Sequence, residues 1–147
     1  MDLFATICAF TPDGKEMTFF AATEPATPVS QRWLRVTQRK LDEACSTDDQ
    51  PMHAHSEQQP LTPGEIYEVD LEIWPASLHL PKGSRLTLTV QGQDFARPGP
   101  GSEGRRGSGP FTHTDGVDRA MPRYDNRHAI HSGGRYASFL QPPVLPN

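Results

Sequence analysis

Two histidines and a carboxylate stand close together in one short stretch, a combination that suits a bound metal ion. His53 and His55 are two residues apart, and Glu57 follows. Two imidazoles on one strand face, together with a carboxylate, can ligate iron, manganese or zinc. However, Pro51 and Pro60 flank the group and place it in a loop. We therefore expect ordinary loop histidines here and assign no metal ligand.

Acyl transfer by an α/β-type enzyme needs a serine exposed in a Gly-x-Ser-x-Gly turn, and this sequence has no such turn. Ser102 and Ser108 lie among glycines, but Pro100 and Arg106 occupy the positions two residues before them. Residues 99–104 match the glycine spacing of a dinucleotide fingerprint. No helical pattern follows to present its N-terminus to a pyrophosphate. We assign no catalytic residue and no cofactor to this chain.

Two tryptophans and an arginine are the residues that we assign to surface recognition. Trp74 falls on the same side of an expected strand as three acidic residues, opposite an apolar stripe. Trp33 and Arg35 lie close together in an earlier strand-like segment. We predict that Trp33, Arg35 and Trp74 contribute to an interface with another domain. Aromatic rings also serve as platforms for sugars, so a carbohydrate-binding module remains an alternative.

Alternating apolar and polar residues indicate that strands position these side chains. The clearest alternation runs from Tyr67 to Ile73, and Leu86, Leu88 and Val90 repeat it. In both segments we expect the apolar stripe to be buried. A Thr11-Pro-Asp-Gly14 turn indicates a hairpin. The expected strands cover residues 3–10, 16–22, 31–38, 67–73, 86–90 and 136–140.

The composition fits one all-β domain. The chain has 147 residues with 12 glycines and 15 prolines, and no long apolar helical stripe. We expect a long Gly/Pro-rich loop at residues 94–127. The net charge of −4 disfavours nucleic acid and anionic lipid as partners. Cys8 and Cys45 are expected to be free thiols, and no signal peptide is evident, so we expect a cytoplasmic location.

A set of turn and strand landmarks resembles a known family. These are Pro63-Gly64-Glu65, Trp74-Pro75, Lys82-Gly83 and Asp94. In this order they resemble the C-terminal β-sandwich of the Xaa-Pro dipeptidyl-peptidase and cocaine esterase family of serine hydrolases. The resemblance implies a jelly-roll, galactose-binding-like β-sandwich over residues 1–147. Because Asp2-Leu3-Phe4 is similar to sequence well inside that sandwich, we expect the domain to be incomplete at its N-terminal end.

The function implied by this resemblance is that of an accessory domain. It would pack on an α/β-hydrolase catalytic domain, rim that domain's active site, and contribute no member of its catalytic triad. Peptide or ester substrates would be bound through the catalytic domain, so the chain alone is expected to be inactive. A free-standing carbohydrate-binding module is the first alternative. A cupin-like metal-binding protein using His53 and His55 is the less favoured one.

Overall fold

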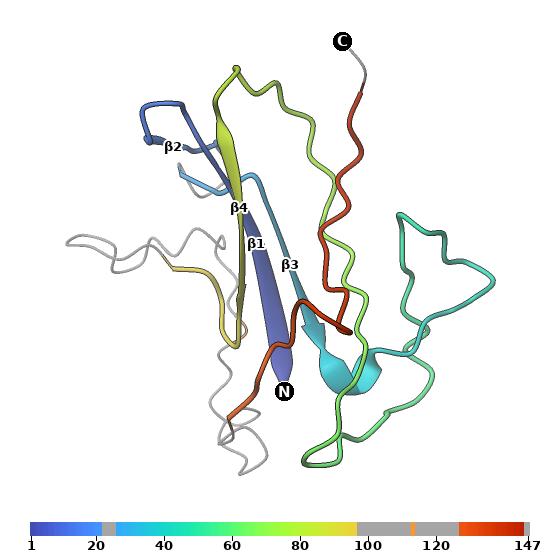
Figure 1. Ribbon diagram of the computed structural model, residues 1–147. Coiled ribbons are helices and arrows are strands. Elements are labelled where there is room, and N and C mark those ends of the chain that lie inside the picture. Colours follow the sequence, from blue (N-terminus) through green and yellow to red (C-terminus); the bar gives the residue numbers. More distant parts are fainter. Residues whose placement is uncertain (22–25, 97–112, 114–126, 146–147) are drawn as a thin grey trace.

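A long central strand organises the molecule. The computed structural model describes residues 1–21, 26–96, 113 and 127–145. Strand β1 (Asp2–Phe10) is a nearly continuous apolar run, as expected for a strand that is covered on both faces. It pairs antiparallel with β4 (Arg85–Gln91) along one edge, and with β3 (Ser30–Arg35) and β2 (Glu16–Met17) along the other. Figure 1 shows β1 between β4 and β3.

The hairpin predicted after β1 is confirmed, with a shorter second arm than expected. The turn closes through a hydrogen bond from the Gly14 amide to the Thr11 carbonyl at 2.9 Å. Gly14 has a φ of 88°, which glycine adopts without steric cost. Pairing then covers only Ala9 with Met17 and Phe10 with Glu16. Beyond β2 a single bridge joins Phe19 to Thr27.

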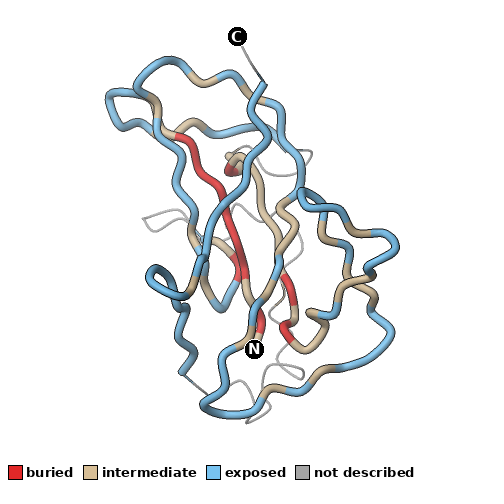
Figure 2. The backbone as a smooth tube through the Cα atoms, turned by 45° about the vertical axis from the view of Figure 1, so that its right-hand side comes forward, coloured by how far each residue is buried: buried red, intermediate tan, exposed pale blue. Residues whose placement is uncertain are grey.

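The buried core lies mainly on β1 and spreads to the strand beside it, as the red part of the tube in Figure 2 shows. Leu34 and Val36 extend it into β3 and into a 3-10 turn, η1 (Val36–Gln38). The segment 31–38, predicted as one strand, is therefore strand only as far as Arg35. The hydrophobic residues of the core are Phe4, Ala5, Ile7, Cys8, Ala9, Leu34 and Val36.

The strand predicted at Tyr67 to Ile73 is wrong, because none of those residues belongs to a ladder. The segment runs beside β3 in Figure 1, and side chains contact two backbone carbonyls, one within it and one just after it. His53 Nε2 lies 3.1 Å from the Asp70 carbonyl, and the Ser30 hydroxyl donates to the Trp74 carbonyl. Alternation of apolar and polar residues determines which side chains tend to be buried. A β-strand also requires hydrogen bonds to the backbone of a neighbouring strand. The apolar residues of the segment are accordingly half-buried without pairing.

Two further expectations need correction. Residues 136–140 do not form a strand; the structure has only a bridge between Gly133 and Tyr136. The predicted burial of the β4 stripe is also wrong, since Leu86, Leu88 and Val90 remain 40–42% exposed. Nearly all of the predicted loop at 94–127 lies outside the described residues.

The all-β fold class is confirmed. The described residues form one four-stranded antiparallel sheet, and their only helical element is η1. None of the described helical structure is long and apolar enough to cross a membrane. The jelly-roll arrangement of the sandwich stays a prediction.

Candidate domain-docking surface

The pairing register places Trp33 and Arg35 on one face of the sheet, whereas Trp74 lies outside the strands. Residues directly paired across antiparallel strands share a face. Phe4 pairs with Trp33 and Asp2 with Arg35, which defines the Trp33 face. The other face, here called the Leu88 face, carries alternate residues of each strand. They are Leu3, Ala5, Ile7 and Ala9 of β1, Ser30, Arg32 and Leu34 of β3, and Leu86, Leu88 and Val90 of β4.

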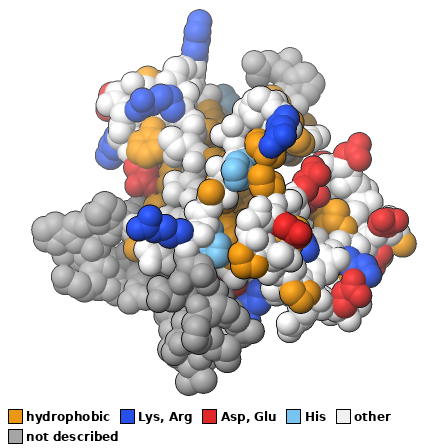
Figure 3. Space-filling model, turned by 60° about the horizontal axis from the view of Figure 1, so that its bottom comes forward, with side chains coloured by type: hydrophobic (Ala, Val, Ile, Leu, Met, Phe, Trp, Pro, Cys, Tyr) orange, Lys and Arg blue, Asp and Glu red, His pale blue; other side chains and the backbone are white. Residues whose placement is uncertain are grey.

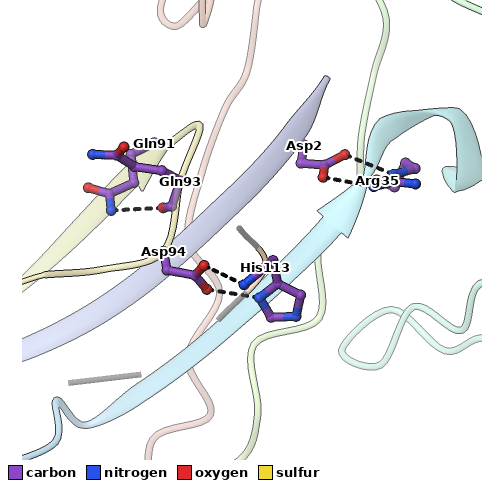
Figure 4. Close-up of polar contacts among 6 residues, drawn as sticks. All are labelled: Asp2, Arg35, Gln91, Gln93, Asp94 and His113. Carbon is purple, nitrogen blue, oxygen red and sulfur yellow. Dashed lines mark hydrogen bonds and ion pairs between the residues drawn. The ribbon is translucent and has the colours of Figure 1, made fainter. Parts of the chain in front are cut away.

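Trp33 is held in an aromatic cluster on its face. Its ring stacks on Phe4 with centroids 6.1 Å apart, and the His113 ring lies 4.3 Å from it. Asp94, which is buried, fixes His113 through two bonds (Figure 4). The backbone N–H of His113 donates to Oδ2 of Asp94 at 2.6 Å, and Nδ1 lies 2.8 Å from Oδ1. Trp33 therefore packs against other side chains of the domain, an arrangement that does not favour a role in stacking on a sugar.

Arg35 is engaged within the same face. Its guanidinium group reaches both carboxylate oxygens of Asp2, with Nε–Oδ1 at 3.1 Å and Nη2–Oδ2 at 3.3 Å (Figure 4). The Asp2 side chain has no exposure to solvent, whereas that of Arg35 is 30% exposed. A two-pronged contact of this kind fixes orientation as well as charge. Arg35 thus joins β3 to the start of β1.

Trp74 differs from the other two because it faces solvent. It is 62% exposed, and the guanidinium group of Arg32 lies 5.9 Å from its ring centroid. The Ser30 hydroxyl holds the Trp74 carbonyl. Since Ser30 and Arg32 belong to the Leu88 face, Trp74 covers the β3 side of that face. The prediction that Trp33, Arg35 and Trp74 meet a partner domain is not tested by this geometry, and only Trp74 presents a large exposed ring.

His53 and His55 are neighbours in an irregular segment of the chain and do not share the face of a regular strand. His53 and His55 have ring centroids 6.1 Å apart, and His55 has a left-handed backbone with a φ of 50°. That conformation breaks the regular alternation that would set both rings on one strand face. Within the described part of the chain, no group of three or more potential metal-binding side chains is present. The cupin-like alternative therefore lacks a third ligand among these residues.

Acidic side chains gather on one side of the molecule, at the right of Figure 3, where Figure 1 places the loop of residues 39–60. A cleft of about 510 Å³ opens there. Its lining combines apolar side chains with three carboxylates. The residues concerned are Leu41, Pro51 and Phe139 together with Glu43, Asp48 and Asp70. None of the predicted interface residues lines this cleft, so it is separate from the candidate docking surface.

Comparison with known families decides the relationship. The family model for the X-Pro dipeptidyl-peptidase C-terminal non-catalytic domain matches residues 1–141. The chain belongs to this family. The resemblance drawn from Pro63-Gly64-Glu65 and the later landmarks is thereby confirmed. The word "non-catalytic" in the family description agrees with the absence of a Gly-x-Ser-x-Gly turn.

Relatives of this C-terminal non-catalytic domain are much longer than the chain. An Xaa-Pro dipeptidyl-peptidase of Lacticaseibacillus rhamnosus is 40% identical over 47 residues, which cover 32% of this chain and 6% of that protein. Two crystal structures of a CocE/NonD family hydrolase from Staphylococcus aureus match with a TM-score of 0.64 and 30% identity. They cover 76% and 78% of this chain, and this chain spans 21% of theirs.

Two side-chain contacts of this C-terminal domain could not be predicted from the sequence: the Asp2–Arg35 ion pair and the hydrogen bonds between Asp94 and His113. In the sequence Asp94 is only one of the family landmarks, and no motif marks His113. Asp2 likewise gave no sign that it pairs with Arg35, because 33 residues separate them. In both cases the partners are distant in sequence, so only strand register and the course of the chain bring them together.

Side-chain contacts of Arg39 and Lys40 hold residues 57–67, the stretch of chain that comes before Trp74. Arg39 donates to the Gln59 carbonyl at 2.7 Å, and its guanidinium group lies 4.4 Å from the Tyr67 ring centroid. Lys40 pairs with Glu57 at 2.9 Å, and this bond lowers the pKa of Glu57. Burial lowers the pKa of His53, and the charges of His55 and Arg32 act in the same direction. The hydrogen bond with the Asp70 carbonyl raises the pKa of His53 and offsets part of this lowering.

The lowered pKa of His53 predicts that acid weakens the fold. The folded state favours the neutral ring, so protonation is harder in the folded than in the unfolded chain. We expect the free energy of unfolding to be unaffected by this group above its ordinary pKa of 6.5. It should fall as the pH drops below 6.5 and through the lower pKa of the folded state. Urea unfolding of the wild type and of His53→Gln between pH 7.5 and 5.5 measures this effect.

The pH range matters because Glu57 titrates separately. Its stabilising contact with Lys40 is lost only as the pH falls below the ordinary glutamate value of 4.5, outside the window used. The His53→Gln variant should therefore show a flatter profile than the wild type. Parallel profiles for the two proteins would contradict the prediction.

Proposed function

We propose that this domain packs against an α/β-hydrolase catalytic domain and rims the active-site cleft of that domain. The reaction would be acyl transfer from an Xaa-Pro peptide or an acyl ester to a serine, followed by hydrolysis by water. Residues outside this chain would perform it. The observation that carries the proposal is the match to the non-catalytic C-terminal domain over residues 1–141. The likeness to a CocE/NonD family hydrolase supports it.

Trp74 is the best-placed anchor for the catalytic domain. Large aromatic residues and arginines contribute more than most residue types to binding free energy at interfaces. Trp74 is mostly exposed and lies beside Arg32, so both groups are near one patch of surface. Trp33 and Arg35 act in this proposal by holding β3, the strand that also carries Arg32. Their contacts with Phe4 and Asp2 fix β3 against β1.

The proposal also includes a cytoplasmic location. Cys8 is buried and Cys45 is exposed, and both are free thiols. Free thiols are typical of a reducing compartment.

A complementation experiment tests this function. The S. aureus CocE/NonD hydrolase, with the region that matches this chain deleted, is assayed on Xaa-Pro and short acyl ester substrates. The isolated chain alone should give no turnover, because it supplies no activated serine. Adding the chain should restore activity to the truncated hydrolase. Trp74→Ser should raise the concentration needed for half-maximal restoration by about thirtyfold, which corresponds to the loss of about 2 kcal/mol from an interface anchor.

A matched control separates docking from loss of apolar surface. Phe139 is 78% exposed, so Phe139→Ser removes a comparable ring from a different place. It should leave the restoration unchanged. Turnover by the isolated chain that a serine-directed phosphonate blocks would show that the domain is catalytic by itself. Equal effects of the two substitutions would show that Trp74 is not the anchor.

A further inference from the structure

Arg32 and Trp74 lie together on the surface in a geometry that the sheet itself defines. Arg32 belongs to β3, where its backbone pairs with the buried Ala5 of β1. The hydroxyl of Ser30, on the same strand, donates to the Trp74 carbonyl and ties the tryptophan to β3. The Arg32 guanidinium group lies 5.9 Å from the Trp74 ring centroid. Both side chains are thus in place before a partner binds.

Arg32 carries a charge that no carboxylate of the described residues neutralises. None of the ion pairs among those residues involves Arg32. They join Arg35 to Asp2, Lys40 to Glu57 and His113 to Asp94. The ring of Trp74 attracts the charge through its face, but it leaves the N–H donors of the guanidinium group available to oxygen acceptors.

The charge of Arg32 also acts on its neighbour His53. Burial is the main cause of the lowered pKa of His53, and the Arg32 charge adds to it. The opposing effect of the Asp70 charge is smaller than that of Arg32. Arg32 therefore outweighs the nearby carboxylate at this point of the surface, although the molecule as a whole has a net charge of −4.

Docking through Trp74 would remove water from Arg32 as well. An interface anchor contributes most when the partner excludes water from it. At 5.9 Å from the ring centroid, the guanidinium group lies within the area that such a partner covers. A charged group that loses water without gaining an acceptor opposes binding strongly. A partner that covers Trp74 therefore has to supply an acceptor for Arg32 at the same place.

We propose that the partner surface that covers Trp74 presents an aspartate or glutamate carboxylate to Arg32. This inference rests on the proposed function, in which that surface belongs to the catalytic domain. A carboxylate matches the planar fork of a guanidinium group through two parallel hydrogen bonds and also neutralises its charge. Backbone carbonyls would satisfy the donors and leave the charge uncompensated. The contact is thus an aromatic anchor beside an ion pair, and it fits an acidic segment.

Substitutions that change the charge of Arg32 test this pairing in the complementation assay with the truncated S. aureus hydrolase. Arg32→Gln removes the charge and should raise the concentration of chain needed for half-maximal restoration by about thirtyfold. Arg32→Glu sets like charges against each other and should raise it by about a further tenfold. Arg32→Lys keeps the charge but loses the fork, so its value should lie between those of the wild type and Arg32→Gln.

Arg85 provides the matched control, because it is exposed and lies on the Trp33 face at the start of β4. Arg85→Gln and Arg85→Glu should leave the restoration unchanged. All variants should melt within a few degrees of the wild type, since these side chains lie at the surface. Equal values for Arg32→Gln and Arg32→Glu, or an Arg32→Gln chain as effective as the wild type, would overturn the carboxylate pairing alone. A wild-type chain that restores no activity would overturn the proposed function and this inference with it.

Discussion

Replacing Arg35 with methionine is expected to destabilise the domain by about 2–4 kcal/mol, because it removes the guanidinium group that pairs with the buried Asp2 carboxylate. The Asp2 side chain has no exposed surface, so its charge is stabilised by protein groups and not by water. The partial exposure of Arg35 keeps the estimate below the upper end for a fully buried pair. For a domain of this size the midpoint of thermal unfolding should fall by about 10 °C. Circular dichroism melts provide the measurement.

Arg32→Met is the matched control for this prediction. Arg32 lies on the same strand but contacts the exposed ring of Trp74. Its loss should change the melting temperature by no more than a few degrees. The double variant Asp2→Val/Arg35→Met should recover part of the stability, since it removes the buried carboxylate charge as well. If Arg35→Met and Arg32→Met behaved alike, the buried pair would contribute no special stability.

Replacing Asp94 with alanine is expected to cost about 2–4 kcal/mol, because it removes the acceptor of two hydrogen bonds from His113. One donor is the His113 backbone N–H and the other is Nδ1. The imidazole would lose its fixed orientation against Trp33 and Phe4, so the aromatic cluster should loosen too. Urea unfolding, together with the near-ultraviolet signal of Trp33, measures both effects.

A graded series distinguishes the two bonds of Asp94. His113→Phe keeps a ring against Trp33 and retains the backbone N–H, so it removes only the bond made by Nδ1. We expect it to cost roughly half as much as Asp94→Ala. An Asp94→Ala variant as stable as the wild type would show that this contact does not hold the sheet to residue 113.

The strand pattern of the sequence succeeded where a partner strand was available. Residues 3–10 and 86–90 were predicted as strands, and both form ladders in the structure. Residues 67–73 have an equally regular alternation, yet they stay outside the sheet. Alternation reports which side chains prefer cover, and it carries no information about whether another backbone lies alongside. The same limit explains why Leu86 and Leu88 were predicted to be buried and are partly exposed.

The sequence by itself determined the all-β class, the hairpin at Thr11 to Gly14, the absence of a nucleophile turn and the family. These features depend on residues that are neighbours in the chain, so local sterics and short motifs encode them. The tertiary structure alone decided that Arg35 meets Asp2 and that His113 meets Asp94. It also divided the predicted interface residues, setting Trp33 into an internal cluster and leaving Trp74 exposed. These outcomes depend on strand register and on contacts between distant segments, which the order of residues does not display.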